Sequence, residues 1–455
     1  MQLGRFTWLF LLAGVAALAA VAVMLFTPRP LSVEPAPDAA DVPPNLPLRI
    51  TFSQPMRADS VPSRLVITPA VAGKITWQGD ALIFTPDHGW PGDARIQVEL
   101  KPGAVSSLGL PVRQPLAWSF TVHRARIAYL SPAGGQASLY AVDAGGEQPP
   151  RQLIPDQGIL DFSIDPKAGV IYYSLPNASG GSDLYAYDLA HSARRMVLAC
   201  PQSICKNPQP SPDGRWLAYE QSPFSTAQAA SVRVWLLPLS GGPPRLAGDP
   251  AHTTYSPAWS SQGWLALYDS SRQGYVVIQP GQGEKAFFAN RTGDLGSWSP
   301  DGYTFLAGDM ASNAAATAPV DRAQTASLPS RILAYESGGG RTRPLTDGSF
   351  EDVSPVWSPD GRRIAFARRF LDAPRWTPGR QLWLMDANGS RPVQLTDSPN
   401  DDHSSFAWSP DGKKLAFVRF NNLALTQPPS LWVITLDSGE LVKLADSAYS
   451  PVWIP

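Results

Sequence analysis

The chain has 455 residues, 16% of them charged, and a formal net charge of −1. This length accommodates two or three domains, and the balanced charge lacks the basic excess that nucleic-acid binding needs. The 47 prolines and 37 glycines favour many turns and short strands over long helices.

The first predicted element is a membrane-spanning helix. Phe6–Phe26 carries no charge and is almost wholly apolar. Its 21 residues would rise roughly 31 Å as a helix, which is the thickness of a bilayer core. A cleaved signal peptide is the alternative, because the run contains small alanines. A cleavable apolar run usually has only about 7–15 residues, and this favours an uncleaved signal anchor over residues 1–30.

A small β-sandwich is predicted next. Residues 31–47 are rich in proline and alanine and are expected to form an extended linker. Several short runs of Ile, Val, Phe and Trp follow, each bounded by Pro, Gly or Asp, as in a sandwich. The segments ITFSQPM, ITPAVAGKITWQGDALIFTP and WSFTV resemble bacterial immunoglobulin-like domains, so the domain is expected over residues 31–122. This resemblance implies a spacer or a binding adaptor.

From Arg126 onward one pattern of short strands recurs. Two apolar strands, such as RIAFARR and QLWLMDA, precede a turn, a shorter run such as VQLTD, and a segment that leads into tryptophan. Successive tryptophans of this kind lie 39 to 59 residues apart. Four short strands at such a period predict a β-propeller over residues 123–455, so the chain beyond its anchor is expected to be all-β. Seven blades are favoured over six or eight, with Tyr449–Ile454 completing the first blade.

The pentapeptide WSPDG, which occurs three times, is interpreted as a structural part. Pro fixes φ, Asp bonds its own backbone, and Gly takes the strained last position of a turn. The segment therefore ends an inner strand and opens a hairpin. Its tryptophan is predicted to pack between neighbouring blades, because the indole is a large apolar body. The repeated positions are Trp259, Trp298, Trp357, Trp408 and Trp453.

These repeats resemble propellers of the TolB type. The pieces AWSPDGKKLAFVR, VWSPDGRRIAFARR and RPLTDGSFEDVSPVW carry the resemblance, which spans the predicted propeller. It is weak in the first two repeats, where FSIDPKAG replaces the usual pattern. The resemblance implies contact with a protein partner rather than catalysis.

Cys200 and Cys205 are the two cysteines of the chain. In an oxidising compartment they would close a small loop through a disulfide, and two free thiols in a cytosolic loop are the alternative. A structural zinc site is disfavoured because the chain offers no second cysteine pair.

A catalytic site finds little support in the sequence. The chain has five histidines and neither a GxSxG elbow nor a glycine-rich phosphate loop. Asp401, Asp402 and His403 could bind a metal or act as acid and base, and His252 occupies the matching place of another repeat. The favoured interpretation of these residues is a solvated loop before an inner strand. No metal and no other cofactor are therefore expected.

The predicted strand order gathers the long insertions on one face. Connections between second and third strands, and between blades, lie on this long-loop face. We expect binding residues there, because loops on a rigid scaffold often carry them. Trp and Arg often dominate protein interfaces. The candidate binding residues, expected to be exposed there or beside it, are Phe224, His252, Arg368, Arg369, Phe370, Trp376, Asp401, Asp402, His403, Arg419 and Phe420.

These elements together predict a non-catalytic binding or scaffold protein of a bacterial cell membrane. It would span the membrane once through Phe6–Phe26, with the bulk of the chain extracytoplasmic, and would bind a protein or a cell-envelope polymer but no nucleic acid. The alternative is a cell-envelope hydrolase or lyase that acts on glycans or peptides at the propeller mouth.

Overall fold

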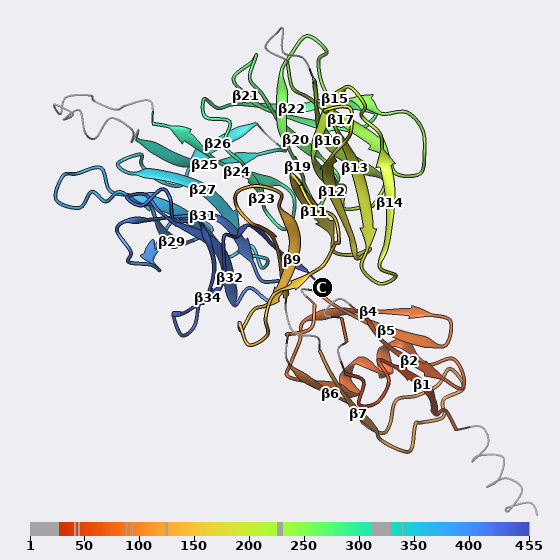
Figure 1. Cartoon of the computed structure of the whole chain (residues 1–455). Coiled ribbons are helices and arrows are strands. Elements are labelled where there is room, and N and C mark those ends of the chain that lie inside the picture. Colours follow the sequence, from red (N-terminus) through yellow and green to blue (C-terminus); the bar gives the residue numbers. More distant parts are fainter. Residues whose placement is uncertain are drawn as a thin grey trace, which may run out of the picture. The chain divides into compact units, whose positions relative to one another are not determined.

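The computed structural model describes residues 27–454 except 41, 44–45, 88, 93, 123–125, 225–230, 312–328 and 339. The chain divides into two compact units, Met1–Arg124 and Ala125–Pro455 (Figure 1). Within the described residues no helix is both long and apolar enough to cross a membrane. The span predicted at Phe6–Phe26 lies outside the described residues.

The first unit is a sandwich of two sheets. One sheet has the order β1(Pro30–Glu34), β2(Leu48–Phe52), β5(Ala81–Pro86), β4(Gly73–Gln78), and the other has the order β3(Leu65–Thr68), β6(Arg95–Leu100), β7(Leu116–Thr121). Two short 3-10 turns, η1(Ala58–Ser60) and η2(Pro62–Arg64), precede β3. Alternate residues of β2 and of β6 are buried, as the period of two along a strand requires.

The segment expected as a linker contributes to this sandwich. Pro30–Glu34 forms the edge strand β1, which pairs antiparallel with β2. Further on, Asp38 N–H donates to Ser119 O at 2.7 Å, and Thr121 N–H donates to Ala39 O at 2.8 Å. Proline is tolerated at a sheet edge, where its missing N–H faces no partner strand, so proline content alone does not mark a free linker.

The second unit contains, among the described residues, seven four-stranded antiparallel blades. Blade 1 combines β35(Tyr449–Ile454) with β8(Arg126–Ser131), β9(Ser138–Asp143) and β10(Arg151–Gln152). Blade 2 contains β11(Asp161–Asp165), β12(Val170–Pro176), β13(Ser182–Asp188) and β14(Ala193–Leu198), and blade 3 contains β15(Ser203–Pro210), β16(Trp216–Pro223), β17(Arg233–Pro238) and β18(Arg245–Leu246). Blade 4 contains β19(Thr254–Trp259), β20(Leu265–Asp269), β21(Gly274–Gln279) and β22(Gly283–Ala289).

The remaining three blades follow the same order from the inner to the outer strand. Blade 5 contains β23(Ser297–Trp298), β24(Thr304–Met310), β25(Ser330–Glu336) and β26(Arg341–Pro344). Blade 6 contains β27(Glu351–Trp357), β28(Arg363–Arg369), β29(Gln381–Asp386) and β30(Val393–Gln394), and blade 7 contains β31(Asp401–Trp408), β32(Lys414–Asn421), β33(Ser430–Thr435) and β34(Glu440–Asp446).

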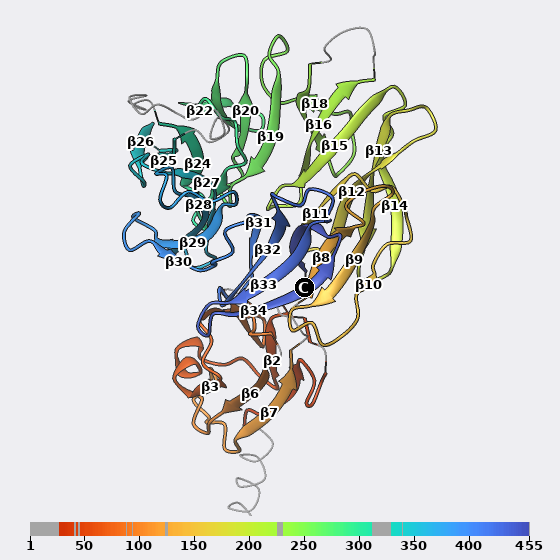
Figure 2. The ribbon, with the colours of Figure 1, turned by 60° about the vertical axis from the view of Figure 1, so that its left-hand side comes forward.

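The last strand closes the ring of blades, as the repeats predict. β35 pairs antiparallel with β8, with Tyr449 opposite Leu130 and Ile454 opposite Arg126. Figure 2 shows the C-terminal end beside β8 and β9. This pairing removes the free edges that an open ring of blades would leave on these strands.

The hydrophobic core of this unit lies between the blades. One cluster joins Ala218, Val234 and Leu236 of blade 3 to Leu265 and Leu267 of blade 4. Second strands are covered on both faces, which explains why they are nearly continuous apolar runs rather than alternating ones.

The repeated tryptophans connect each inner strand to the blade before it. The indole N–H of Trp259 donates to Gln209 O at 2.9 Å, and that of Trp298 donates to Ala258 O at 3.0 Å. Trp408 and Trp453 donate in the same way to the inner strands of blades 6 and 7. The Trp357 indole N–H has no partner among the described residues, and its ring packs with the core between blades 5 and 6.

The WSPDG turns have the predicted chemistry. Ser358 Oγ donates to Asp360 Oδ1 at 2.6 Å, and the same carboxylate oxygen accepts the Arg362 N–H at 3.1 Å. Gly361 takes φ 69°, a left-handed conformation that favours glycine. These turns, together with those between third and fourth strands, form the tight-turn face, opposite the long-loop face.

Candidate binding face and its charged rim

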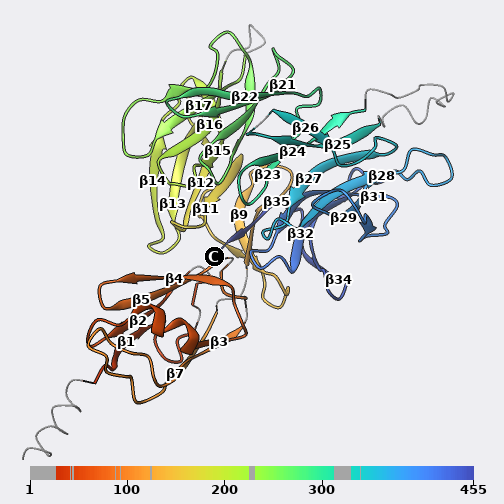
Figure 3. The same ribbon diagram turned by 180° about the vertical axis from the view of Figure 1, so that it is seen from behind.

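Charged residues gather at the long-loop end of blades 6 and 7. They lie where the inner strands β27 and β31 begin, where the second strands β28 and β32 end, and in the loop between β28 and β29, which Figure 3 shows projecting beyond β28. We call this set the rim cluster. Its members are Glu351, Asp352, Arg368, Arg369, Arg380, Asp401, Asp402, His403 and Arg419.

Arg368 is buried rather than exposed, contrary to the prediction. Its Nε and Nη2 atoms donate to the two carboxylate oxygens of Asp352 at 2.6 and 2.9 Å. The guanidinium carbon lies 4.3 Å from the ring centroid of Phe350 and 5.0 Å from that of Trp383. A planar guanidinium stacks on aromatic rings and forms bidentate pairs, so the end of β28 holds it inside the fold.

A second group of ion pairs joins blade 6 to blade 7. The Arg380 N–H and Nε both donate to Asp402 Oδ1, at 2.9 and 2.8 Å. Arg369 lies 3.8 Å from the same carboxylate and 3.4 Å from Glu351. Arg369 and Asp402 were predicted to be exposed, and both are buried because these contacts lie within the junction of the two blades.

His403 is also buried and does not lie in a loop. β31 already begins at Asp401, so the three polar residues of this segment are part of the inner strand. His403 Nδ1 lies 2.8 Å from Arg380 O, which requires Nδ1 to donate, and the ring packs 5.4 Å from Phe417. Burial lowers the pKa of His403, which opposes the raising effect of that hydrogen bond. His403 is therefore a neutral imidazole at neutral pH.

Asp401 and His252 are engaged in separate contacts. Asp401 forms an ion pair with Arg419, whose guanidinium lies over the Trp432 ring. His252 Nδ1 lies 2.7 Å from Asp269 Oδ2, and both residues line a pocket of about 530 Å³ at blades 3 and 4. The structure therefore does not place His252 in the rim cluster. Within the described part of the chain no three His, Cys, Asp or Glu side chains are grouped to hold a metal ion.

Most of the aromatic side chains among the predicted binding residues are partly covered. Phe370 packs edge-on against Phe350 at 5.3 Å, and its own face is covered by Arg375 at 4.3 Å. Trp376 and Phe420 are half-buried. Phe224 is 54% exposed, as predicted for a binding residue.

Exposed apolar side chains that the sequence reasoning missed lie on the long-loop face. Leu423 and Leu425, between β32 and β33, are 68% and 81% exposed. On the tight-turn face, Tyr303 is exposed and packs on Trp264, and Val393 is exposed where β30 begins. The exposed large hydrophobic residues of the long-loop face are Leu160, Phe224, Met310, Leu423 and Leu425, whereas the exposed Leu295 lies beside the inner strand β23.

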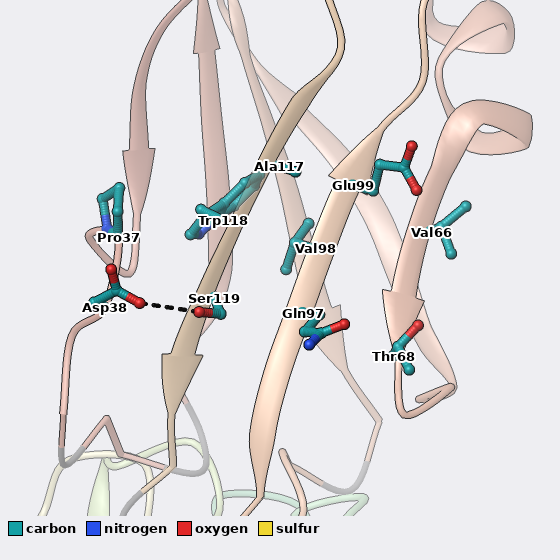
Figure 4. A pocket seen from close by; sticks show the side chains of 10 residues that line it. All are labelled: Pro37, Asp38, Val66, Thr68, Gln97, Val98, Glu99, Ala117, Trp118 and Ser119. Atoms are coloured by element: carbon teal, nitrogen blue, oxygen red, sulfur yellow. Dashed lines mark hydrogen bonds between the residues drawn. The ribbon is translucent and has the colours of Figure 1, made fainter.

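The first unit has a groove of its own. It measures about 420 Å³ and lies on the open face of the sheet β3-β6-β7, with Gln97 and Glu99 on one strand and Ser119 on the next (Figure 4). Asp38 accepts a hydrogen bond from Ser119 Oγ at 3.1 Å across its edge.

These two architectures define the class of the protein: an N-terminal sandwich followed by a closed seven-bladed propeller in the described chain. Residues 27–122 match the family profile of the bacterial Ig-like domain, so the first unit belongs to that family. A TolB protein of Novosphingobium aromaticivorans is 38% identical over 80 residues, which cover 18% of this chain and 16% of that protein.

Other relatives differ in the length that they share. The uncharacterized peptidase YuxL of Bacillus subtilis is 32% identical over 28% of this chain, and the chain spans 17% of that peptidase. An uncharacterized protein of Agrobacterium fabrum is 26% identical over 62% of this chain and 91% of its own length. Among solved structures, TolB from Acinetobacter baumannii has 16% identity and a TM-score of 0.46, with 86% of this chain and 83% of that chain covered.

Proposed function

We propose that the propeller is a binding module that recognises a protein or polymeric partner through its long-loop face. The observation that carries this proposal is the distribution of exposed apolar residues. Leu160, Phe224, Leu423 and Leu425 are solvent-exposed on connections of this face. Neighbouring exposed apolar residues, such as Leu423 and Leu425 in one loop, are typical of an interaction surface.

Hydrogen bonds beside the rim cluster support this function by fixing the loops before binding. Gly379 N–H donates to Pro399 O at 2.8 Å, and Asn422 Nδ2 donates to Pro378 O at 2.7 Å. These bonds tie the connection between β28 and β29 to blade 7. Loops that are already ordered lose less entropy on binding, which strengthens association.

The catalytic alternative is weaker at this face. Asp402 and His403 are each 1% exposed, and both are engaged with Arg380. A general acid or base must come within hydrogen-bond reach of its substrate, and buried groups in a packed junction cannot do so without movement.

We also propose that the chain is anchored in a bacterial cell membrane by Phe6–Phe26, with both units outside the cytoplasm. The uncharged apolar run and the disulfide between Cys200 and Cys205 support this placement. Protease added to intact spheroplasts should digest the bulk of the chain. Complete protection while the membrane stays sealed would contradict the proposed orientation.

The binding face can be tested by site-specific photo-cross-linking in the native cells. A photoreactive amino acid at Phe224 or Leu425 should yield discrete adducts of higher mass. The same group at Val393 or Leu441, exposed residues of the outer strands β30 and β34, serves as a matched control and should yield none. Equal labelling of both sets, or adducts from the outer strands alone, would overturn the proposed face.

A further inference from the structure

The inner strands surround a pocket of about 550 Å³ that none of the preceding contacts explains. We call it the channel pocket. Its volume falls within the range of roughly 300–1,000 Å³ that is typical of small-ligand sites. Its lining comes from five blades: Asn207 and Gln209, Pro257–Trp259, Leu295, Gly296 and Trp298, Ser354–Val356, and Ser404–Phe406.

Backbone bulges bring polar groups to this pocket. The register of β27 against β28 shifts between Val353 and Val356, and Ser354 within this bulge has φ 54°. In blade 7 the shift lies between Ser404 and Ala407, and Ser405 also has φ 54°. A left-handed serine is strained, and bulges are common where a strand must re-aim a side chain next to a functional site.

The lining contains no charged side chain. Its hydroxyl groups come from Ser354, Ser404 and Ser405, and no hydrogen bond joins these three side chains to another part of the described chain. They are free to donate to and accept from a ligand, because a hydroxyl offers one donor and two acceptor positions.

Two indole rings complete the lining. The N–H groups of Trp259 and Trp298 are already bonded to Gln209 O and Ala258 O, and this fixes both rings. Both rings are half-buried, and both residues line the pocket. An aromatic face gives a flat apolar surface at little cost in side-chain entropy.

We propose that the channel pocket binds an uncharged saccharide unit. A sugar ring presents hydroxyl groups at its edge and an apolar C–H face, and these match the serines and the indoles. An ionised ligand would lose its hydration with no opposite charge in the lining, whereas a purely apolar ligand would leave the three hydroxyls unpaired. The proposal concerns a different site from the long-loop face and does not depend on a protein partner.

The test uses the full chain in a detergent without sugar head groups, because such groups would compete for the pocket. Maltotriose, cellotriose and chitotriose are the neutral probes, and trigalacturonate is the charged comparison. Binding is measured by saturation-transfer NMR and by calorimetry. We expect at least one neutral trisaccharide to bind saturably. Trigalacturonate should bind at least about ten-fold more weakly than that trisaccharide.

Two matched variants locate the binding. Ser405→Asp places a carboxylate in the lining without backbone conflict, since Asp tolerates left-handed φ, and should weaken binding about ten-fold or more. Ser450→Asp is the control, because Ser450 occupies the equivalent bulge of β35 at φ 52° and is not part of the lining. It should bind as the wild type does. A third variant, Ser404→Ala, removes one hydroxyl and should weaken binding about two- to ten-fold if Ser405→Asp fails to fold.

The proposal is overturned if none of the neutral trisaccharides binds saturably. It is also overturned if trigalacturonate binds as tightly as the best neutral probe, which would indicate an anion site. Equal weakening by Ser405→Asp and Ser450→Asp would place the sugar elsewhere. Photo-cross-linking at the long-loop face is read independently, so the two proposals can fail separately.

Discussion

Removing the carboxylate of Asp352 should destabilise the propeller more than most single substitutions. Asp352 is fully buried and accepts both bonds of the Arg368 guanidinium, whose side chain is only 6% exposed. Asp352→Val would leave that guanidinium charged and unpaired among Phe350, Phe366 and Trp383. A buried cation without its partner is a costly state, because neither water nor a carboxylate then compensates its charge.

The magnitude follows from the geometry of the pair. Breaking a buried ion pair by removing one partner costs about 3–5 kcal/mol, and Arg368→Met alone should cost a similar amount because it leaves Asp352 unpaired. The double variant Asp352→Val/Arg368→Met removes both charges and places an apolar chain against three aromatic rings. We expect its unfolding free energy to lie within about 1–2 kcal/mol of wild type, since apolar replacement of a buried pair is often neutral.

The assay is a double-mutant cycle measured by chemical denaturation of the full chain, with circular dichroism following the propeller. Asp386→Ala is the control, because the pair of Asp386 with Arg391 is exposed and should contribute little. Two results would refute the interpretation of this pair as tightly coupled. In one, the single variants unfold like wild type; in the other, the double variant is no more stable than the less stable single variant.

Three further predictions concern the junction of blades 6 and 7 and the disulfide. Burial lowers the pKa of His403 below its unfolded value of about 6.5. Below about pH 6.5 the unfolded chain therefore binds a proton at His403 more readily than the folded chain does. The free energy of unfolding should fall between pH 7 and 5 by at most about 1.4 kcal/mol per pH unit. His403→Gln should flatten this part of the profile, and an unchanged slope would show that other groups cause it. Gly379→Ala would place a Cβ 2.0 Å from a carbonyl oxygen of blade 7 and should cost about 1–3 kcal/mol, whereas Gly338→Ala, with open space around it, should melt like wild type. Unreduced mass spectrometry should find Cys200 and Cys205 bonded, and replacing both with serine should cost less than about 3 kcal/mol, because the closed loop is short.

The repeats were predictable because their chemistry is local. A WSPDG turn needs only its own Ser, Asp and Gly, and the structure forms it from those groups, as at Ser358, Asp360 and Gly361. In blade 2, where FSIDPKAG replaces the pattern, the turn is different: Asp165 accepts the N–H groups of Lys167 and Ala168, and Gly169 N–H donates to Asp165 O. The closing strand was predictable for a related reason, because an incomplete blade at each end of a repeat array requires a partner.

The burial of the rim cluster was not predictable from those patterns. Arg368 and Asp402 are charged, and charged residues near predicted loops are ordinarily exposed. The burial of Asp402 depends on contacts between blades that are adjacent in space but carried by separate repeats, such as its pair with Arg380. The burial of Arg368 depends on its pair with Asp352 on the neighbouring strand of the same blade. A local pattern also cannot show that β31 begins at Asp401 rather than after His403. This earlier start places Asp402 and His403 in the inner strand.

The division between buried charges and exposed aliphatic residues decides which mutations can locate the binding face. Substituting Arg368 or Asp402 would disturb the packing of blades 6 and 7, so a loss of partner binding could follow from altered loops alone. Leu423 and Leu425 are 68% and 81% exposed, and their substitution should leave the melting temperature unchanged. Lost binding with unchanged stability at these exposed positions therefore separates recognition from loop support, which no substitution within the rim cluster can do.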